Sequence, residues 1–249
     1  DEAWISCQYY LRSHPRYEKA EQLDQLGWRQ DKQWFRANDM REKTEKLITI
    51  LPQNEKMSFP FISKNSKLLR DLFNLLQHPY IFPVCAIDFI TEQNLVVVVL
   101  PVSTKGSLKD FIYKSRFTTS SSDKYRNKSK GLSVKQIALF GRQILEALIY
   151  MEEKGFPIHG HLHSGNIILD NGVCRVSGYE NTFLGYTSNV YEKVRRKIKH
   201  NREALDVVCF GHLLYEMSTG CELDTPFPEP HHLTYGAEPL PCQGKITLE

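Results

Sequence analysis

The sequence predicts an α+β protein of two lobes, in which a small sheet with one helix is followed by a mainly helical lobe. In the first hundred residues, short β-branched and aromatic runs alternate around one helical stripe of leucines, whereas the second half carries long helical patterns and one tight hairpin turn. With 249 residues, of which 41% are hydrophobic, the chain is large enough to form both cores. Truncation of the second lobe after Gly220 stays an open alternative, because little periodicity follows that residue.

The composition excludes several classes of protein. A balance of 32 basic against 29 acidic residues gives a net charge of only +3 and no argument for nucleic-acid binding. The longest apolar run, residues 95–102, is too short to cross a bilayer. The six cysteines have no paired spacing, which favours a reducing, cytoplasmic compartment. Because the chain begins at Asp1 without a methionine or a signal-type segment, we expect a piece of a longer protein.

We expect the first half to divide into an N-terminal extension, residues 1–19, and a first lobe, residues 20–101. Within the extension, the aromatic-rich stretch from residue 3 to residue 11 fits either a helix or a docking strand. The leucine stripe from Leu68 to Leu76 predicts one helix, which His78 and Pro79 end. Alternating or continuous β-branched runs predict four strands, at residues 33–37, 46–51, 84–89 and 95–100.

The second lobe is expected to span residues 102–220. Its polar insert, residues 114–133, lacks apolar anchors and predicts a flexible surface loop. A capping box of Ser133 and Gln136 starts the clearest helix, and a second helix is expected from about Leu205 to Ser218. Between them, the turn at residues 170–172 predicts a two-stranded hairpin. The tail, residues 221–249, is rich in proline and histidine and predicts no regular element.

The order of motifs in the second half resembles the C-lobe of a eukaryotic protein kinase. Residues 159–166, His-Gly-His-Leu-His-Ser-Gly-Asn, match the catalytic loop H-R-D-L-x-x-x-N, and Gly178-Tyr179-Glu180 follow the hairpin where kinases carry D-F-G. Residues 106–108 match the hinge, and residues 78–81 match the turn after the αC helix of kinases. The resemblance covers about residues 20–220 and implies a two-lobed kinase-like fold.

This resemblance also implies that the reactive residues of a kinase are replaced, since phosphoryl transfer needs carboxylates, metal ligands and a lysine on the nucleotide phosphates. The degenerate positions are the catalytic aspartate, the magnesium-binding aspartate, the lysine of the third strand and the glutamate of αC, which fall on His161, Gly178, Ile50 and Leu69. Two remnants survive, Gly27 of the glycine-rich loop and Asn166 of the metal site. We therefore expect a pseudokinase without catalytic residues, metal or cofactor.

The framework residues of the fold are retained. The resemblance assigns His159 and Asp206 to bracing the catalytic loop, with Asp206 buried and accepting hydrogen bonds from the backbone of residues 159–161. It also places Tyr179 in the slot of the D-F-G phenylalanine, stacked between Phe73 and His159.

Three strings narrow the resemblance further. Residues 141–146, 159–163 and 209–217 are similar to the slowpoke-binding protein and PX-domain kinase-like family, and the absence of a visible PX domain favours the slowpoke-binding branch. The resemblance implies a regulatory adaptor that modulates a membrane channel or transporter, such as a potassium channel, with 14-3-3 proteins as partners. It implies a cytoplasmic protein, and recruitment to the plasma membrane through a partner stays an alternative.

Alternatives remain at several of these residues. The three alternating histidines of residues 159–163 could ligate zinc, but no cysteine or carboxylate cluster completes a shell, so we expect no metal site. A residual ATP-binding serine/threonine kinase is the alternative function, using Lys46 or Lys32 as a displaced lysine and Glu180 as a metal ligand.

A basic run marks the part of the chain that matches the activation segment. A solvated face is the plainer interpretation, and an acidic protein, an anionic lipid or a phosphopeptide is the functional one. The candidate partner-binding residues are Lys193, Arg195, Arg196, Lys197 and Lys199.

Overall fold

A computed structural model gives the architecture of the chain. It describes residues 2–23, 26, 31–103, 105–116, 119, 124–125, 129–198, 204–223 and 225–231. The helices are α1 (Glu2–Ser13), α2 (Ser63–Asn74), α3 (Leu108–Ile112), α5 (Val134–Glu153), α6 (Glu180–Leu184), α7 (Asn189–Lys197) and α8 (Ala204–Thr219), with short 3-10 helices at Thr91–Gln93 and Ser164–Asn166. The strands are β1 (Tyr17–Leu23), β2 (Gln33–Asp39), β3 (Thr44–Pro52), β4 (Ala86–Ile90), β5 (Leu95–Pro101), β6 (Ile167–Asp170) and β7 (Val173–Val176).

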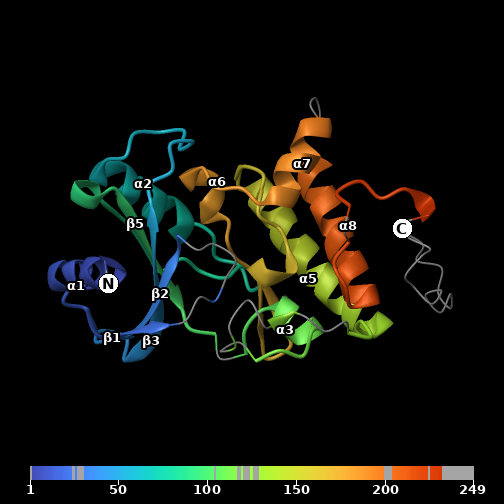
Figure 1. Ribbon diagram of the computed structural model, residues 1–249, viewed down its shortest axis with the longest axis horizontal. Helices are drawn as coiled ribbons and strands as arrows, with labels where there is room; N and C mark the ends of the chain where they lie inside the picture. Colours follow the sequence, from blue (N-terminus) through green and yellow to red (C-terminus); the bar gives the residue numbers. More distant parts are fainter. Residues whose placement is uncertain are drawn as a thin grey trace.

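The first lobe is an antiparallel sheet between two helices, in the strand order β1-β2-β3-β5-β4 (Figure 1). Successive side chains of a strand point to opposite faces, and both faces of this sheet are apolar. One face packs under α1, where Cys7 and Tyr10 join Phe35, while the other face packs on α2 through Leu69 and Phe73. The four predicted strands differ from the observed ones by at most two residues at either end.

The expected boundary at residue 20 falls within strand β1. Strand β1 begins at Tyr17, three residues before that boundary, and pairs along its length with β2. Helix α1 is also part of this lobe, since Cys7 and Tyr10 are buried against the sheet. The aromatic stretch near the start of the chain is therefore a helix of the first lobe.

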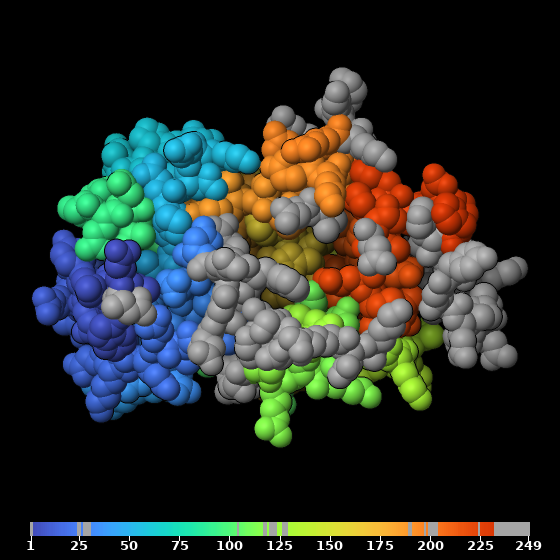
Figure 2. Space-filling model, viewed as in Figure 1, coloured from blue at the N-terminus to red at the C-terminus, as the bar shows by residue number. Residues whose placement is uncertain are grey.

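The second lobe is built on α5 and α8, which pack side by side (Figure 1). The predicted capping box at the start of α5 is present, because Ser133 accepts from the Gln136 N–H and the Gln136 side chain accepts from the Ser133 N–H. The hairpin β6–β7 turns at Asn171 and Gly172, both of which have positive φ, as a two-residue turn requires. Figure 2 shows the two lobes as adjoining masses, blue to teal and orange to red. One apolar core continues from α2 into α8.

The polar insert has anchors that its composition does not reveal. Among its described residues, Lys124 is buried, and its ammonium lies 3.0 Å from the carboxylate of Asp110 in α3. The hydroxyl of Tyr125 donates to the same carboxylate at 2.9 Å. Further along, Leu132 N donates to Met217 O at 2.7 Å, which ties the end of the insert to α8. The expectation of an unanchored loop is wrong for these residues.

The first residues of the tail lie against the second lobe. Glu222 pairs with the buried Lys109 of α3, and His212 of α8 hydrogen-bonds to Pro226 O at 3.1 Å. Residues 232–249, and with them most of the expected tail, lie outside the described part of the chain. None of the helices in the described ranges combines the length and the apolar character needed to cross a membrane.

Candidate functional site

The catalytic-loop segment is held by α8 through one carboxylate. Asp206 accepts hydrogen bonds from His159 N at 2.8 Å and from Gly160 N at 3.3 Å, which are the backbone contacts that the sequence predicts. Asp206 itself is half-buried and not fully buried as expected, because it lies in the first turn of α8 at the edge of the core. A carboxylate on backbone N–H groups makes a charge-assisted bond, so Asp206 fixes the entry to the loop.

His159 is a buried neutral side chain. Its Nδ1 accepts from His161 N at 3.0 Å, so Nε2 carries the proton and donates to Ser177 O at 2.8 Å. Burial lowers the pKa of His159, since the charged ring would have no water. The ring therefore joins the loop to the strand end after β7 and has no free nitrogen for a metal.

Tyr179 connects the degenerate D-F-G segment to the first lobe. Its ring meets Phe73 of α2 edge-on, with centroids 5.5 Å apart. The buried hydroxyl donates to Phe82 O at 3.0 Å and accepts from Val84 N at 3.2 Å. A phenylalanine could fill the slot but could not make these two bonds. The expected stack on His159 is not among the ring contacts of the described residues, whereas the contact with Phe73 is present.

Gly178 and Asn166 share the place where a kinase carries its metal ligands. Gly178 has a φ of +80°, and a Cβ at this position would lie 2.7 Å from Asn166 Nδ2. The same Nδ2 donates to His161 O at 2.8 Å. The amide of Asn166 therefore occupies the space that a side chain at residue 178 would need, and it is held there by the loop backbone.

The residues at this site do not fit a divalent cation. Magnesium prefers carboxylate oxygens, yet the residues that the sequence predicts at the two carboxylate positions are His161 and Gly178, and the Asn166 amide is engaged with the backbone. Glu180 is buried at the start of α6. Within the described ranges, no group of three or more histidine, cysteine, aspartate or glutamate side chains could hold a metal ion.

The histidine trio has no ligand geometry either. The rings of His161 and His163 are 6.5 Å apart and inclined at 56°. His161 is buried, and burial together with the neighbouring histidines lowers its pKa to about 3. His161 is therefore neutral at physiological pH and lacks the negative charge of a kinase's catalytic carboxylate.

Ile50, which the sequence predicts at the lysine position, lies on the face of β3 that is turned away from α2. The kinase lysine must face αC to reach its glutamate, but Ile50 lies in the cluster under α1 while Leu69 lies in the cluster under α2. The alternation of β3 places Thr49 on the α2 side, where it is fully buried and donates to Val98 O at 3.3 Å. The α2-facing residues of β3 include no lysine, and Leu69 supplies no carboxylate.

The two candidate lysines of the alternative function, Lys46 and Lys32, lie in different surroundings. Lys46 shares the α1 side of β3 with Ile50, is buried, and pairs with Glu42 at 2.6 Å, so it faces away from the catalytic-loop segment. Lys32, just before β2, has its ammonium 4.4 Å from the centre of the Trp34 ring. Its charge also lowers the pKa of His161.

The basic run forms the outer face of α7. Tyr191 and Val194 are buried against the second lobe, whereas Lys193, Arg195 and Arg196 are exposed. None of these three cations forms an ion pair with another described residue. The side chain of Lys197 and the whole of Lys199 lie outside the described residues, as does Gly27.

The comparisons with known proteins agree with this geometry. A sequence model described as protein tyrosine and serine/threonine kinase matches residues 38–235. The chain is 44% identical over 219 residues to the slowpoke-binding protein of Drosophila melanogaster, which covers 86% of the chain and 42% of that relative. It is 39% identical over 217 residues to the PX domain-containing protein kinase-like protein of Mus musculus, which covers 85% of the chain and 36% of that relative.

The name of a third relative refers to its activity. The probable inactive serine/threonine-protein kinase slob2 of Dictyostelium discoideum is 33% identical over 233 residues, which covers 91% of the chain and 40% of that relative. The chain thus spans less than half the length of these relatives. The matched kinase model, the two-lobed fold and these identities together show that the chain belongs to the protein kinase family, in the branch of the slowpoke-binding and PX domain-containing kinase-like proteins.

Proposed function

We propose that the chain is a catalytically inactive kinase-like adaptor, which uses the kinase fold to bind protein partners and not to transfer phosphate. The single observation that carries this proposal is the contact of Gly178 with Asn166, which leaves neither a metal-binding carboxylate nor room for one. Two further observations support the same conclusion: the α2-facing side of β3 has no lysine, and His161 is neutral. The names of the Dictyostelium relatives, probable inactive kinases, agree with it.

The partner in this proposal is a membrane channel. The Drosophila relative is named for binding Slowpoke, and the potassium channel implied by the family resemblance is the finer proposal for this chain. Modulation of the channel, 14-3-3 proteins as further partners, and a cytoplasmic protein recruited to the plasma membrane through the channel belong to the same proposal.

The basic face of α7, defined by Lys193, Arg195 and Arg196, is the proposed contact surface for an acidic segment of such a partner. Its three side chains are exposed and unpaired among the described residues. An acidic protein segment is favoured over a solvated face because the helix is fixed to the lobe by Val194, which holds the cations in one orientation.

A transfer assay tests the inactive part of the proposal. Purified protein with magnesium or manganese and labelled ATP should transfer no phosphate above background. The double substitution His161→Asp with Gly178→Asp should not restore transfer, because β3 still has no lysine that faces α2. Transfer by the unmodified protein that Asn166→Ala abolishes would overturn the proposal.

A binding assay tests the adaptor part separately. The affinity for immobilised cytoplasmic segments of a Slowpoke channel should fall about tenfold in Lys193→Glu with Arg196→Glu. The control is Lys64→Glu with Lys67→Glu on α2, which makes the same change of charge at two exposed residues. Equal losses in both variants would show that only net charge matters and would refute the α7 surface.

The alternative function, a residual ATP-binding kinase, has only one of its two candidate lysines left. Lys46 faces the α1 side and is set aside, so that function would depend on Lys32 together with Glu180. The contact of Lys32 with the Trp34 ring and the burial of Glu180 do not favour this function over the adaptor.

A further inference from the structure

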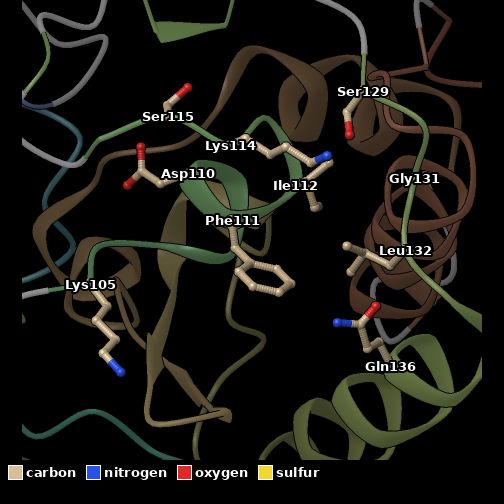
Figure 3. Close-up of a pocket in the computed structure, with 10 residues that line it drawn as sticks. All are labelled: Lys105, Asp110, Phe111, Ile112, Lys114, Ser115, Ser129, Gly131, Leu132 and Gln136. Atoms are coloured by element: carbon tan, nitrogen blue, oxygen red, sulfur yellow. The ribbon is translucent and has the colours of Figure 1, made fainter.

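A groove between α3 and the start of α5 lies outside the degenerate site. It encloses a cavity of about 440 Å³, within the range of ligand pockets, roughly 300–1,000 Å³. Figure 3 shows the Phe111 ring directed across the cavity toward Leu132 and Gln136, with the Lys114 side chain extending toward Ser129 above it. The floor and walls therefore carry apolar groups, and a cation lies at the rim.

Both walls of the groove are fixed before any ligand arrives. On one side, the capping box of Ser107 and Asp110 starts α3, and Lys124 and Tyr125 hold Asp110 from the insert. On the other side, Ser129 N donates to Gly220 O at 3.2 Å, and Gly131 lies so close to the end of α8 that a Cβ there would be 2.2 Å from Ser218 O. Such preorganisation lowers the entropic cost of binding.

Phe111 is the apolar centre of the groove. Its side chain is 40% exposed although its ring meets the buried Phe140 edge-on, with centroids 6.0 Å apart. Leu139 and Val134, on the exposed side of the adjoining α5, are 48% and 57% exposed. An aromatic ring with apolar neighbours at the surface, backed by a rigid core, is the kind of anchor found at the centre of protein interfaces.

Among the described residues that line the cavity, cations outnumber carboxylates. Asp110 is the only carboxylate among the residues that line the cavity, and Lys124 neutralises it. The segments that line the cavity present five exposed cations, none in an ion pair with a described carboxylate: Lys105, Lys114, Arg116, Lys130 and Lys135. These cations on the segments beside an apolar centre are complementary to an apolar side chain flanked by carboxylates.

We propose that this groove is a docking site for a short linear segment of a partner protein, with an apolar side chain inserted beside Phe111 and acidic residues on both sides of it. Three of the five cations, Arg116, Lys130 and Lys135, neighbour the lining residues in sequence without lining the cavity. We therefore infer that the occupant is an extended chain and not a compact small molecule. The site is separate from the basic face of α7 and does not depend on the proposed channel partner.

Selection from a displayed library of random peptides tests the proposal with the full chain as bait. Enriched peptides should carry an apolar residue between aspartates or glutamates. Their Kd should rise about tenfold or more in Phe111→Ser, and about tenfold in Lys105→Glu with Lys114→Glu. The charge-matched control, Lys64→Glu with Lys67→Glu on α2, lies outside both proposed surfaces and should leave the Kd unchanged.

Several results would overturn the docking site. One is the absence of enriched peptides. Another is that Phe111→Ser leaves the Kd of the enriched peptides unchanged, and a third is an equal loss of affinity in the α2 control. Binding of an RNA or of phosphatidylserine vesicles that the lysine reversal abolishes and Phe111→Ser leaves intact would show an anion surface instead. Thermal melting of each variant checks that it is folded. If Phe111→Ser unfolds, the double variant Lys105→Glu with Lys114→Glu still tests the groove, because both of its substitutions are at exposed side chains. None of these results bears on the transfer assay.

Discussion

Replacing Gly178 with alanine probes the contact that closes the metal position. The new Cβ would lie 2.7 Å from Asn166 Nδ2 and 2.8 Å from its Cγ, at a residue whose φ is +80°. An L-residue in this left-handed region costs about 1–2 kcal/mol. Asn166 can move away only by giving up its bond to His161 O, which is worth about 1 kcal/mol. Together these terms predict a loss of roughly 2–3 kcal/mol in the free energy of unfolding.

Denaturant unfolding and thermal melting of Gly178→Ala measure this loss. For a chain of this size, about 2–3 kcal/mol corresponds to a fall in Tm of roughly 4–12 °C. In the double variant with Asn166→Ala, the clash is gone, so the combined loss should be smaller than the sum of the single losses by about 1 kcal/mol. A neutral Gly178→Ala, or losses that add, would refute the close contact between the two residues.

Three further predictions concern stability. Asp206→Ala should cost about 2–4 kcal/mol, because it strips two backbone N–H groups of their acceptor, whereas Asp206→Asn should cost less; equal costs would contradict the hydrogen-bond role. The hydrogen bonds from Arg16 hold the pKa of Asp39 at about 2, so this carboxylate stabilises the fold above about pH 4, and that contribution should be lost as the pH falls toward 2 and be absent from Asp39→Asn. Burial raises the pKa of Glu216 to about 7, so its charged form destabilises the fold increasingly as the pH rises from about 4.5 to 7, and urea titrations of Glu216→Gln should lack that decline.

Much of the fold follows from local pattern. The hairpin is set by Asn171 and Gly172, which adopt positive φ at little cost, and α5 by its capping box, so both could be located from the sequence. The carboxylate of Asp206 was also predicted on the right backbone groups, since its spacing from the loop is characteristic of the kinase fold. These features depend on few residues that are close in sequence or tied to a motif.

The face of the sheet on which a side chain of β3 lies could not be predicted in the same way. In β3 both faces are apolar, so alternation alone does not tell which face meets α2, and Ile50 was assigned to the face that Thr49 occupies. The pairing of Thr49 with Val98, which packs on the α2 side, identifies the face that meets α2. A correct prediction would have needed that strand register.

Two other features depend on contacts distant in sequence. Lys124 and Tyr125 look like members of a polar loop, and only the fold brings them to Asp110. Likewise, Gly178 reads as a lost aspartate in the sequence, while the filling of its space by Asn166 is a matter of packing.

Nucleotide binding measured by thermal shift tests the loss of kinase chemistry most directly. With the full chain, ATP and magnesium together should give no rise in Tm beyond that given by either alone, because His161 and Gly178 supply no carboxylate and Asn166 is already engaged. The same absence of a magnesium-dependent shift is expected for Asn166→Ala. A rise in Tm that requires both ATP and magnesium, and that Asn166→Ala removes, would contradict the pseudokinase and establish an occupied nucleotide–metal site.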